Sequence, residues 1–320
     1  MDWLLYCFAR ALFAVLQALP LRWVARIGRF FGALAYALDK RHRRVAQKNL
    51  ANCFPDKSAE EIRALARENF RRIGENWGCA VRVAGMRPEE IANIMELVGA
   101  EKIAPGHAPG APQSLVFAIG HFGNFELFAF VARAAKGYRS ATTYRALRSP
   151  RLNGLMLKLR KYSGCLFFER RMEGAALRAA MRDSRVVLGL LADQHAGTRG
   201  VRLPFFGRTC ATSKAPAVFA LRFQVPLHTA ICYRTDLGRW RVEVGDEIPT
   251  TVAGRPRSVG EIMLDVNRAF EVAVRRDPAN WFWVHNRWKL PPTATPDIPI
   301  LTPVAGQTAN DRLDAELDEN

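Results

Sequence analysis

From residue 114 to residue 275, short apolar runs alternate with segments of helical periodicity, and this alternation limits the possible folds more than any other feature of the chain. Strands are predicted at residues 115–119, 141–144, 165–168, 186–192, 226–232 and 240–244. Helices are predicted at residues 125–135, 152–162, 174–182, 215–223 and 259–275. Because such alternation is typical of α/β domains, the sequence predicts a mixed, mostly parallel sheet flanked by helices.

The first 38 residues are apolar but are interrupted by polar or helix-breaking residues, namely Arg10, Gln17, Pro20, Arg22, Arg26 and Arg29. A membrane-spanning helix over residues 3–19 would place Arg10 near the bilayer centre, which is costly. We therefore expect membrane-associated helices that lie in the interface, with Trp3 and Trp23 inserted. A pair of core helices is the alternative. No cleavable signal peptide is convincing, and the basic run 40–44 favours the cytoplasmic side.

Four regions follow from these patterns along the chain. Residues 1–50 form the apolar and basic membrane-associated helices, and residues 51–112 form a helical segment with a linker. In this second region Ser58 and Glu61 form a capping box that opens an amphipathic helix, and the Pro- and Gly-rich residues 105–112 form a loop. Residues 113–290 form the α/β domain, and the acidic tail 291–320 is expected to be mobile.

The net charge of +17, from 47 basic and 30 acidic side chains, predicts an anionic partner. A chain that is 49% hydrophobic and 24% charged is neither wholly disordered nor a polytopic membrane protein. The charge is concentrated: residues 133–172 contain eleven basic side chains and one acidic side chain. Residues 1–50 contain nine basic and two acidic side chains, whereas the last thirty residues contain six acids and one arginine.

The spacing of cysteines and histidines predicts neither disulfides nor a metal site. The six cysteines form no C-x-x-C pair, so a reducing compartment is the simplest interpretation. Four histidines outside the motifs described below show no metal-ligand spacing, namely His42, His107, His195 and His228.

The most informative motif is His121-Phe-Gly-Asn-Phe-Glu126, which directly follows the predicted strand 115–119 and opens a helix. His121 lies at the carboxyl end of this strand, where α/β sheets collect ligands. We expect Glu126 to hydrogen-bond one imidazole nitrogen, which fixes the tautomer and leaves the other nitrogen to accept a proton. Asn124, in the same motif, is a candidate for substrate binding. The motif contains no serine or cysteine, so the base would activate a substrate hydroxyl directly; a structural histidine is the alternative.

Two further segments place polar side chains near the predicted sheet. Asp193 and Gln194 end the strand 186–192, so Asp193 and His121 are expected to converge at one edge, although Asp193 could be an ordinary turn residue. Residues 281–289 interleave three tryptophans with basic residues and could form a final strand or helix with its basic residues exposed. Such a mixture also occurs in nucleic-acid sites, but no nucleic-acid-binding motif accompanies it, and no nucleic-acid partner is predicted.

Together these residues resemble the bacterial lipid A biosynthesis acyltransferases, the lauroyl and myristoyl transferases. The resemblance extends over nearly the whole chain. Its elements occur in order: the Asn49–Pro55 segment, His121 with Glu126, Tyr144-Arg145, Asp193-Gln194, Pro204-Phe-Phe-Gly207 and Trp283-Val-His-Asn-Arg-Trp-Lys289. Their order and spacing together make the match specific.

The resemblance implies transfer of a fatty acyl chain from an acyl carrier protein thioester to a hydroxyl of a phosphorylated glycolipid, the lipid A precursor. The reaction would take place at the cytoplasmic face of the inner membrane. His121 would deprotonate the hydroxyl and Glu126 would orient the imidazole, without a covalent enzyme intermediate. No cofactor and no metal is implied; the partners would be the acidic carrier protein, anionic membrane lipid and the glycolipid.

The resemblance also suggests substrate-binding residues. Arg145 best matches the family's arginine and would neutralise a lipid phosphate or the phosphopantetheine arm, with Arg148, Arg170 and Arg171 as alternatives. Asp193, beside Gln194, would hold the site or the acceptor. The family often has a second acid after Asp-Gln, where this chain has His195.

Three other functions are alternatives to this one. An acyl-CoA-dependent acyltransferase for another glycolipid, such as a phosphatidylinositol mannoside, shares the same signatures. A non-catalytic membrane-binding adaptor would leave His121 and Glu126 unexplained. A serine hydrolase would need a G-x-S-x-G motif, which the chain lacks.

Overall fold

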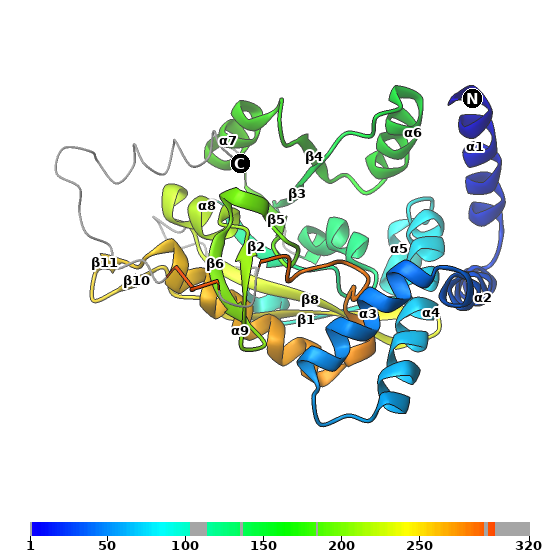
Figure 1. The fold of residues 1–320 in the computed structure, drawn as a ribbon. Helices are drawn as coiled ribbons and strands as arrows, with labels where there is room; N and C mark the ends of the chain where they lie inside the picture. Colours follow the sequence, from blue (N-terminus) through cyan, green and yellow to red (C-terminus); the bar gives the residue numbers. More distant parts are fainter. Residues whose placement is uncertain (1, 103–113, 135–136, 184, 291–293, 298–320) are drawn as a thin grey trace.

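The computed structural model describes residues 2–102, 114–134, 137–183, 185–290 and 294–297. Within them, seven strands form one sheet in the order β1-β9-β8-β2-β5-β3-β4, in which only β8 and β9 pair antiparallel (Figure 1). The strands are β1 (Met95–Val98), β2 (Leu115–Ile119), β3 (Arg139–Tyr144), β4 (Leu166–Glu169), β5 (Val186–Leu191), β8 (Leu227–Asp236) and β9 (Arg239–Glu247). The expected mixed, mostly parallel sheet flanked by helices is confirmed.

The helices predicted at residues 152–162, 174–182, 215–223 and 259–275 are confirmed as the last four of the nine α-helices in the described residues. The nine are α1 (Asp2–Ala18), α2 (Leu21–Leu38), α3 (Lys40–Cys53), α4 (Ala59–Val83), α5 (Pro88–Ala92), α6 (Pro150–Lys161), α7 (Gly174–Asp183), α8 (Ala215–Phe223) and α9 (Val259–Arg276). The Ser58 capping box at the start of α4 is confirmed. The segment expected to be a helix at 125–135 is a 3-10 helix, η2 (Phe125–Ala134). The predicted loop 105–112 and most of the predicted mobile tail 291–320 lie outside the described residues.

Two segments differ from the sequence prediction. Residues 201–212, for which the sequence predicts no strand, form a hairpin of β6 (Val201–Phe205) and β7 (Arg208–Thr212). The hairpin forms because β6 alternates inward and outward side chains, and Phe206 and Gly207 both have the positive φ that a tight two-residue turn needs. Residues 281–289, expected to be a strand or helix, are irregular apart from one bridge between Phe122 and Trp281.

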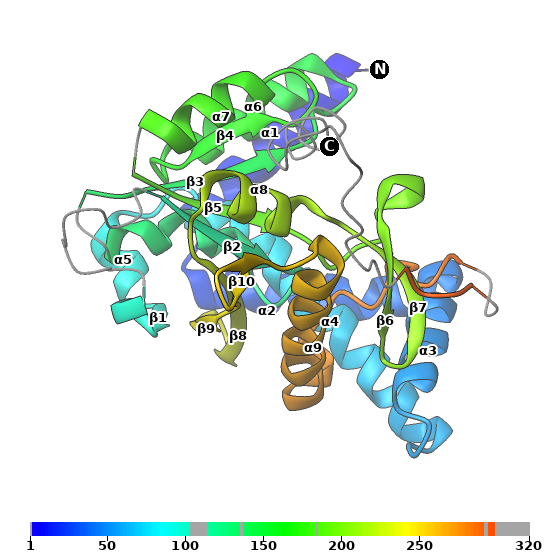
Figure 2. The same ribbon diagram turned by 90° about the vertical axis from the view of Figure 1, so that its left-hand side faces the viewer.

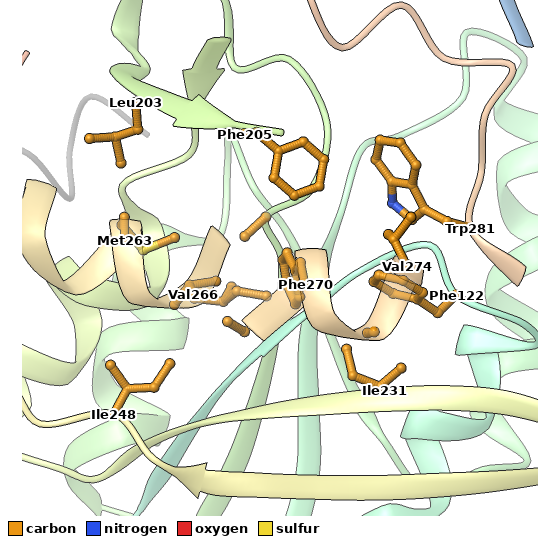
Figure 3. Packing of buried hydrophobic residues seen from close by; sticks show 14 of the residues in the cluster. Phe122, Leu203, Phe205, Ile231, Ile248, Met263, Val266, Phe270, Val274 and Trp281 are labelled. Carbon is orange, nitrogen blue, oxygen red and sulfur yellow. The ribbon is translucent and has the colours of Figure 1, made fainter. Parts of the chain in front are cut away.

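The central strand β2 is buried on both faces. Val116 and Ala118 belong to a core cluster with α7, α8 and α9, whereas Leu115, Phe117 and Ile119 pack with η2 and with parts of α2 and α4. Figure 3 shows that the first cluster extends along α9 to Trp281 and Phe122, and Phe122 lies just beyond the end of β2. The strand is therefore a rigid base for the loop that follows it.

The α2 and α4 helices touch at their backbones. A Cβ added to Gly28 would lie 2.4 Å from the Gly74 carbonyl oxygen, so the contact requires glycine. Glu75, fully buried beside it, accepts hydrogen bonds from Arg29 and Arg234, 3.3 and 2.9 Å away. These contacts fix α4 against both the N-terminal helices and the sheet.

The first helix contrasts with this tight packing. In the described residues α1 buries no side chain, and it lies at the edge of the molecule near α6 (Figures 1 and 2). Large apolar side chains of α1 and α2 are exposed, namely Trp3, Leu4, Leu5, Phe8, Leu12, Val15, Trp23, Phe30, Phe31, Leu34 and Leu38. None of the helices in the described part of the chain is long and apolar enough to cross a membrane.

Candidate functional site

The register of β2 and β5 brings His121 and Asp193 together. Ile119 pairs with Leu191 in the parallel ladder, and the two polar residues each lie two positions further along. His121 and Asp193 therefore lie next to each other at the carboxyl ends of β2 and β5. The convergence expected from the sequence is confirmed, because the imidazole and the carboxylate are in hydrogen-bond contact.

The carboxylate of Asp193 accepts hydrogen bonds from both the side chain and the backbone of His121. Its Oδ1 accepts a hydrogen bond from His121 Nδ1 (2.8 Å), while its Oδ2 accepts from the His121 backbone N–H (2.9 Å) and from Trp281 Nε1 (2.8 Å). Burial by itself raises the pKa of Asp193, but the adjacent imidazole and these donors outweigh it and hold the pKa at about 2. An ionised carboxylate only accepts hydrogen bonds, so the proton lies on Nδ1 and the lone pair on Nε2.

The exposed side of the imidazole is bounded by aromatic rings and an amide. The ring centroid of Phe125 lies 4.7 Å and that of Phe282 5.7 Å from the His121 ring. Gln194 Nε2 lies 3.4 Å from His121 Nε2. The basic nitrogen is thus placed in a mostly apolar setting with one weak donor beside it.

Glu126 does not occupy the expected position against His121. Its Oε1 accepts a hydrogen bond from Arg160 Nη2 (2.8 Å), which ties η2 to α6. The carboxylate on His121 Nδ1 is that of Asp193 instead, because the parallel register delivers Asp193 directly to the ring. Glu126 still lines the same cleft as His121.

The cleft beside His121 is formed by three segments. They are the middle of α4, the turn 121–126 and residues 279–282, and the space between them is narrow and partly open to solvent. Apolar side chains form much of the wall, namely Ile73, Trp77, Ala80, Phe125 and Phe282. Such a lining suits an apolar part of a substrate next to His121.

Residues 278–288 pack against the site around His121, and the sequence prediction missed this role. Asn49 Nδ2 donates to the carbonyls of Trp283 and His285 (3.0 and 2.9 Å). Arg287, expected to be exposed, is fully buried and donates to Gln194 O, and among the described residues no side-chain acid pairs with it. It also donates to Ala211 O and Thr212 Oγ1, 3.0 and 2.9 Å away. The aromatic and basic pattern of residues 281–289 was the available signal, but its long-range acceptors cannot be seen in sequence.

The candidate substrate-binding arginines lie at the same edge of the sheet. Arg145 and Arg148 follow β3 and Arg170 and Arg171 follow β4; all four are exposed. In the described residues no hydrogen bond or ion pair joins their side chains to His121. The structure thus groups them near one another, beyond β5, and away from the imidazole.

Two further histidines, His195 and His285, border the site. The backbone N–H of His195 donates to His285 Nε2 (3.0 Å). Burial lowers the pKa of His285 to about 4, opposed by Asp193 and assisted by Lys289. In the part of the chain that the structure describes, no group of three or more His, Cys, Asp or Glu side chains is arranged to hold a metal ion.

Comparisons with known proteins point in one direction. A family model described as bacterial lipid A biosynthesis acyltransferase matches residues 1–290. The lipid A biosynthesis palmitoleoyltransferase of Escherichia coli (strain K12) is 24% identical over 290 residues, which cover 88% of this chain and 90% of that protein. The lipid A biosynthesis lauroyltransferase of the same organism is 32% identical over 102 residues, which cover 32% of this chain and 33% of that protein.

Proposed function

The chain belongs to the bacterial lipid A biosynthesis acyltransferase family and is therefore an acyltransferase, and we propose that it moves a fatty acyl chain from an acyl carrier protein thioester to a hydroxyl of a phosphorylated lipid A precursor. The observation that carries the chemistry is the contact between His121 and the buried Asp193 at the wall of the apolar cleft.

In this proposal His121 acts as a general base. Its Nε2 takes the proton of the acceptor hydroxyl while the hydroxyl oxygen attacks the thioester carbonyl carbon. The new carbon–oxygen bond forms, the carbon–sulfur bond breaks, and the leaving thiolate takes the proton from the imidazolium. Asp193 stays ionised throughout and stabilises the imidazolium that forms.

The buried cysteines support direct transfer without a covalent enzyme intermediate. Burial raises the pKa of the Cys165 thiol to about 12 and also raises the thiol pKa of Cys53, Cys79, Cys210 and Cys232. A protonated, buried thiol is a poor nucleophile. The acceptor hydroxyl is therefore the attacking group in this proposal.

The exposed arginines supply charge for anionic groups. Arg145, Arg148, Arg170 and Arg171 lie together on loops at the carboxyl ends of β3 and β4. Guanidinium groups bind phosphate bidentately, so these residues suit a lipid phosphate or the acidic surface of a carrier protein. The glycolipid and the carrier would then approach from the same edge of the sheet.

The exposed apolar side chains of α1 and α2 support attachment to the cytoplasmic face of the inner membrane, with the helices lying in the interface. Helices that bury one apolar face bind the boundary of headgroups and acyl chains. Vesicle flotation tests this: replacing Phe8 and Leu12 by Glu is expected to lower binding to anionic vesicles at least tenfold. Replacing the exposed Val272, on α9, by Glu is the matched control. Equal binding by all three proteins would contradict the interfacial role of α1.

Product analysis tests the proposed reaction. The purified full chain is given acyl carrier protein thioester or acyl-CoA, together with a phosphorylated or a dephosphorylated lipid A precursor, and the lipids are analysed by mass spectrometry. We expect addition of one acyl group, fastest with the carrier protein thioester and the phosphorylated acceptor. Equal rates with acyl-CoA would overturn the choice of donor, and the absence of acylation in every combination would overturn the function.

A further inference from the structure

Three asparagines in the wall of the cleft have buried amide atoms without hydrogen-bond partners in the described part of the chain. They are Asn69 on α4, Asn124 at the start of η2 and Asn280 beyond α9, with exposed fractions of 1%, 1% and 4%. Two acceptors, Asn69 Oδ1 and Asn280 Oδ1, and one donor, Asn124 Nδ2, are unpaired. We call these three residues the asparagine subsite; all three line the cleft that His121 also lines.

The protein fixes the orientation of two of these amides. Asn69 Nδ2 donates to the carbonyls of Ala279 and Trp281 (2.9 and 2.5 Å), and Asn280 Nδ2 donates to the carbonyl of Cys232 (2.9 Å). Because a flipped amide would bring its oxygen against these carbonyls, each Oδ1 must remain the free acceptor. Asn280 Oδ1 also lies 3.2 Å from the position of a Cβ on Gly123, another lining residue of the cleft.

The unpaired atoms are concentrated at this place. Of the six buried side-chain nitrogen and oxygen atoms without a partner in the described residues, three belong to the asparagine subsite. A buried polar atom that is left unpaired destabilises the protein. Elsewhere the buried amide of Asn267 is bonded at both ends, donating to Pro204 O and accepting from Arg287. Such a local deficit marks the place in the cleft where a polar group of a substrate gains most by binding.

We propose that the asparagine subsite binds a secondary amide of a substrate. An amide carbonyl accepts from Asn124 Nδ2, its N–H donates to one Oδ1, and a neighbouring N–H or O–H donates to the other. A phosphate or carboxylate is disfavoured because it brings no hydrogen to donate to two carbonyl oxygens. An unsubstituted fatty chain is disfavoured because it leaves all three atoms unpaired.

This inference rests on the proposed function for the source of the amide. The pantetheine arm of a thioester donor contains two secondary amides, and the amide that links a fatty chain to an amino sugar supplies one from the acceptor side. Both present the same hydrogen-bond pattern to the subsite. The experiment therefore needs probes from each source.

Binding of short, non-reactive probes tests the subsite independently of turnover. S-hexylpantetheine is compared with a hexyl thioether of equal length that lacks both amides, and N-hexanoylglucosamine is compared with its ester-linked counterpart. Calorimetry is carried out on the wild type, on Asn124→Asp and on Asn76→Asp. Asn124→Asp replaces the free donor by an acceptor. Asn76→Asp places the same charge in the same cleft but keeps the acceptor for Trp240 Nε1, 3.3 Å away.

We expect wild type to bind one amide probe at least tenfold more tightly than its counterpart, and the pair that shows this preference identifies the source. Asn124→Asp should reduce the preference to less than threefold, with Asn124→Ala as a second variant, whereas Asn76→Asp should retain it. Equal binding within both pairs by wild type, or an unchanged preference in both Asn124 variants, would overturn the proposal. An amide preference in a protein that transfers no acyl chain would leave the subsite standing and overturn the proposed function alone.

Discussion

Two carboxylates, Asp193 and Glu126, lie near the imidazole of His121, and they differ in burial and in hydrogen-bond partners. The side chain of Asp193 is 1% exposed and accepts three hydrogen bonds, from His121 twice and from Trp281. The side chain of Glu126 is 24% exposed and accepts one hydrogen bond, from Arg160. Asp193 is thus dedicated to holding His121, whereas Glu126 connects η2 with α6 at the cleft. Proximity in sequence is a poor guide to which acid orients a base.

The largest expected effect is that of Asp193→Asn. An amide nitrogen facing Nδ1 would move the imidazole proton to Nε2 and remove the lone pair that the acceptor hydroxyl needs. We expect kcat to fall about 10²–10⁴-fold, as the loss of such a positioning carboxylate does in other enzymes. Single-turnover kinetics measure the loss and circular dichroism checks the fold. A loss of less than tenfold would show that the tautomer does not depend on Asp193.

Glu126→Gln should have a smaller effect that passes through Arg160. We expect activity to fall about 10–100-fold, and Arg160→Gln to behave similarly. The double variant should be no worse than either single variant, since residues that act as one unit give non-additive effects. A greater loss in Glu126→Gln than in Asp193→Asn would reverse the assignment of the two acids. Additive losses would separate Glu126 from Arg160.

The sequence was sufficient for the convergence of His121 and Asp193, because both end neighbouring parallel strands and strand ends are set by local apolar runs. It was insufficient for the choice of carboxylate. That choice depends on the 3-10 geometry of residues 125–134 and on a competing cation 34 residues further along the chain. Neither is encoded in the spacing of the H-x4-E motif.

The same limit applies to segments without regular structure. The sequence predicts an exposed Arg287 because this residue lies in a basic run. In the structure Arg287 is fully buried and donates hydrogen bonds to acceptors from two distant segments. The β6–β7 hairpin was missed because its strands are short and β6 contains Pro204. In each case the deciding contacts are between residues far apart in sequence.

Trp281→Phe removes one of the three hydrogen bonds that Asp193 accepts, and the other two, from His121, remain. Loss of the indole donor leaves Oδ2 with the His121 backbone N–H alone, which raises the pKa of Asp193 from about 2 but keeps the carboxylate ionised at pH 7. We expect kcat to fall about three- to tenfold, and the free energy of unfolding to fall by about 1–3 kcal/mol. Kinetics and urea unfolding measure the two. Unchanged values in both would mean that the indole only fills space.

The smallest expected effect is on the pH dependence of stability, and it comes from His285. Burial lowers the pKa of His285, and the negative charge of Asp193 partly offsets this lowering. The folded pKa is about 4 and the unfolded pKa about 6.5, so between these pH values only the unfolded chain binds the proton. Stability is therefore full above pH 6.5 and falls as the pH drops toward 4. Because the ring is partly exposed, we expect a loss of about 1–2 kcal/mol.

Urea unfolding between pH 4 and 7 measures this dependence. His285→Gln, which has no group that titrates in this range, should flatten the curve over this interval. A variant curve parallel to that of wild type would assign the dependence to other groups.

The most direct test of the account is the single-turnover rate of acyl transfer by His121→Ala, with a carrier protein thioester and a phosphorylated lipid A precursor. General-base catalysis contributes about 10²–10⁴-fold, so we expect the rate to fall at least a hundredfold. Vesicle binding and the circular dichroism spectrum should stay those of wild type. A rate near that of wild type would contradict the assignment of His121 as the base.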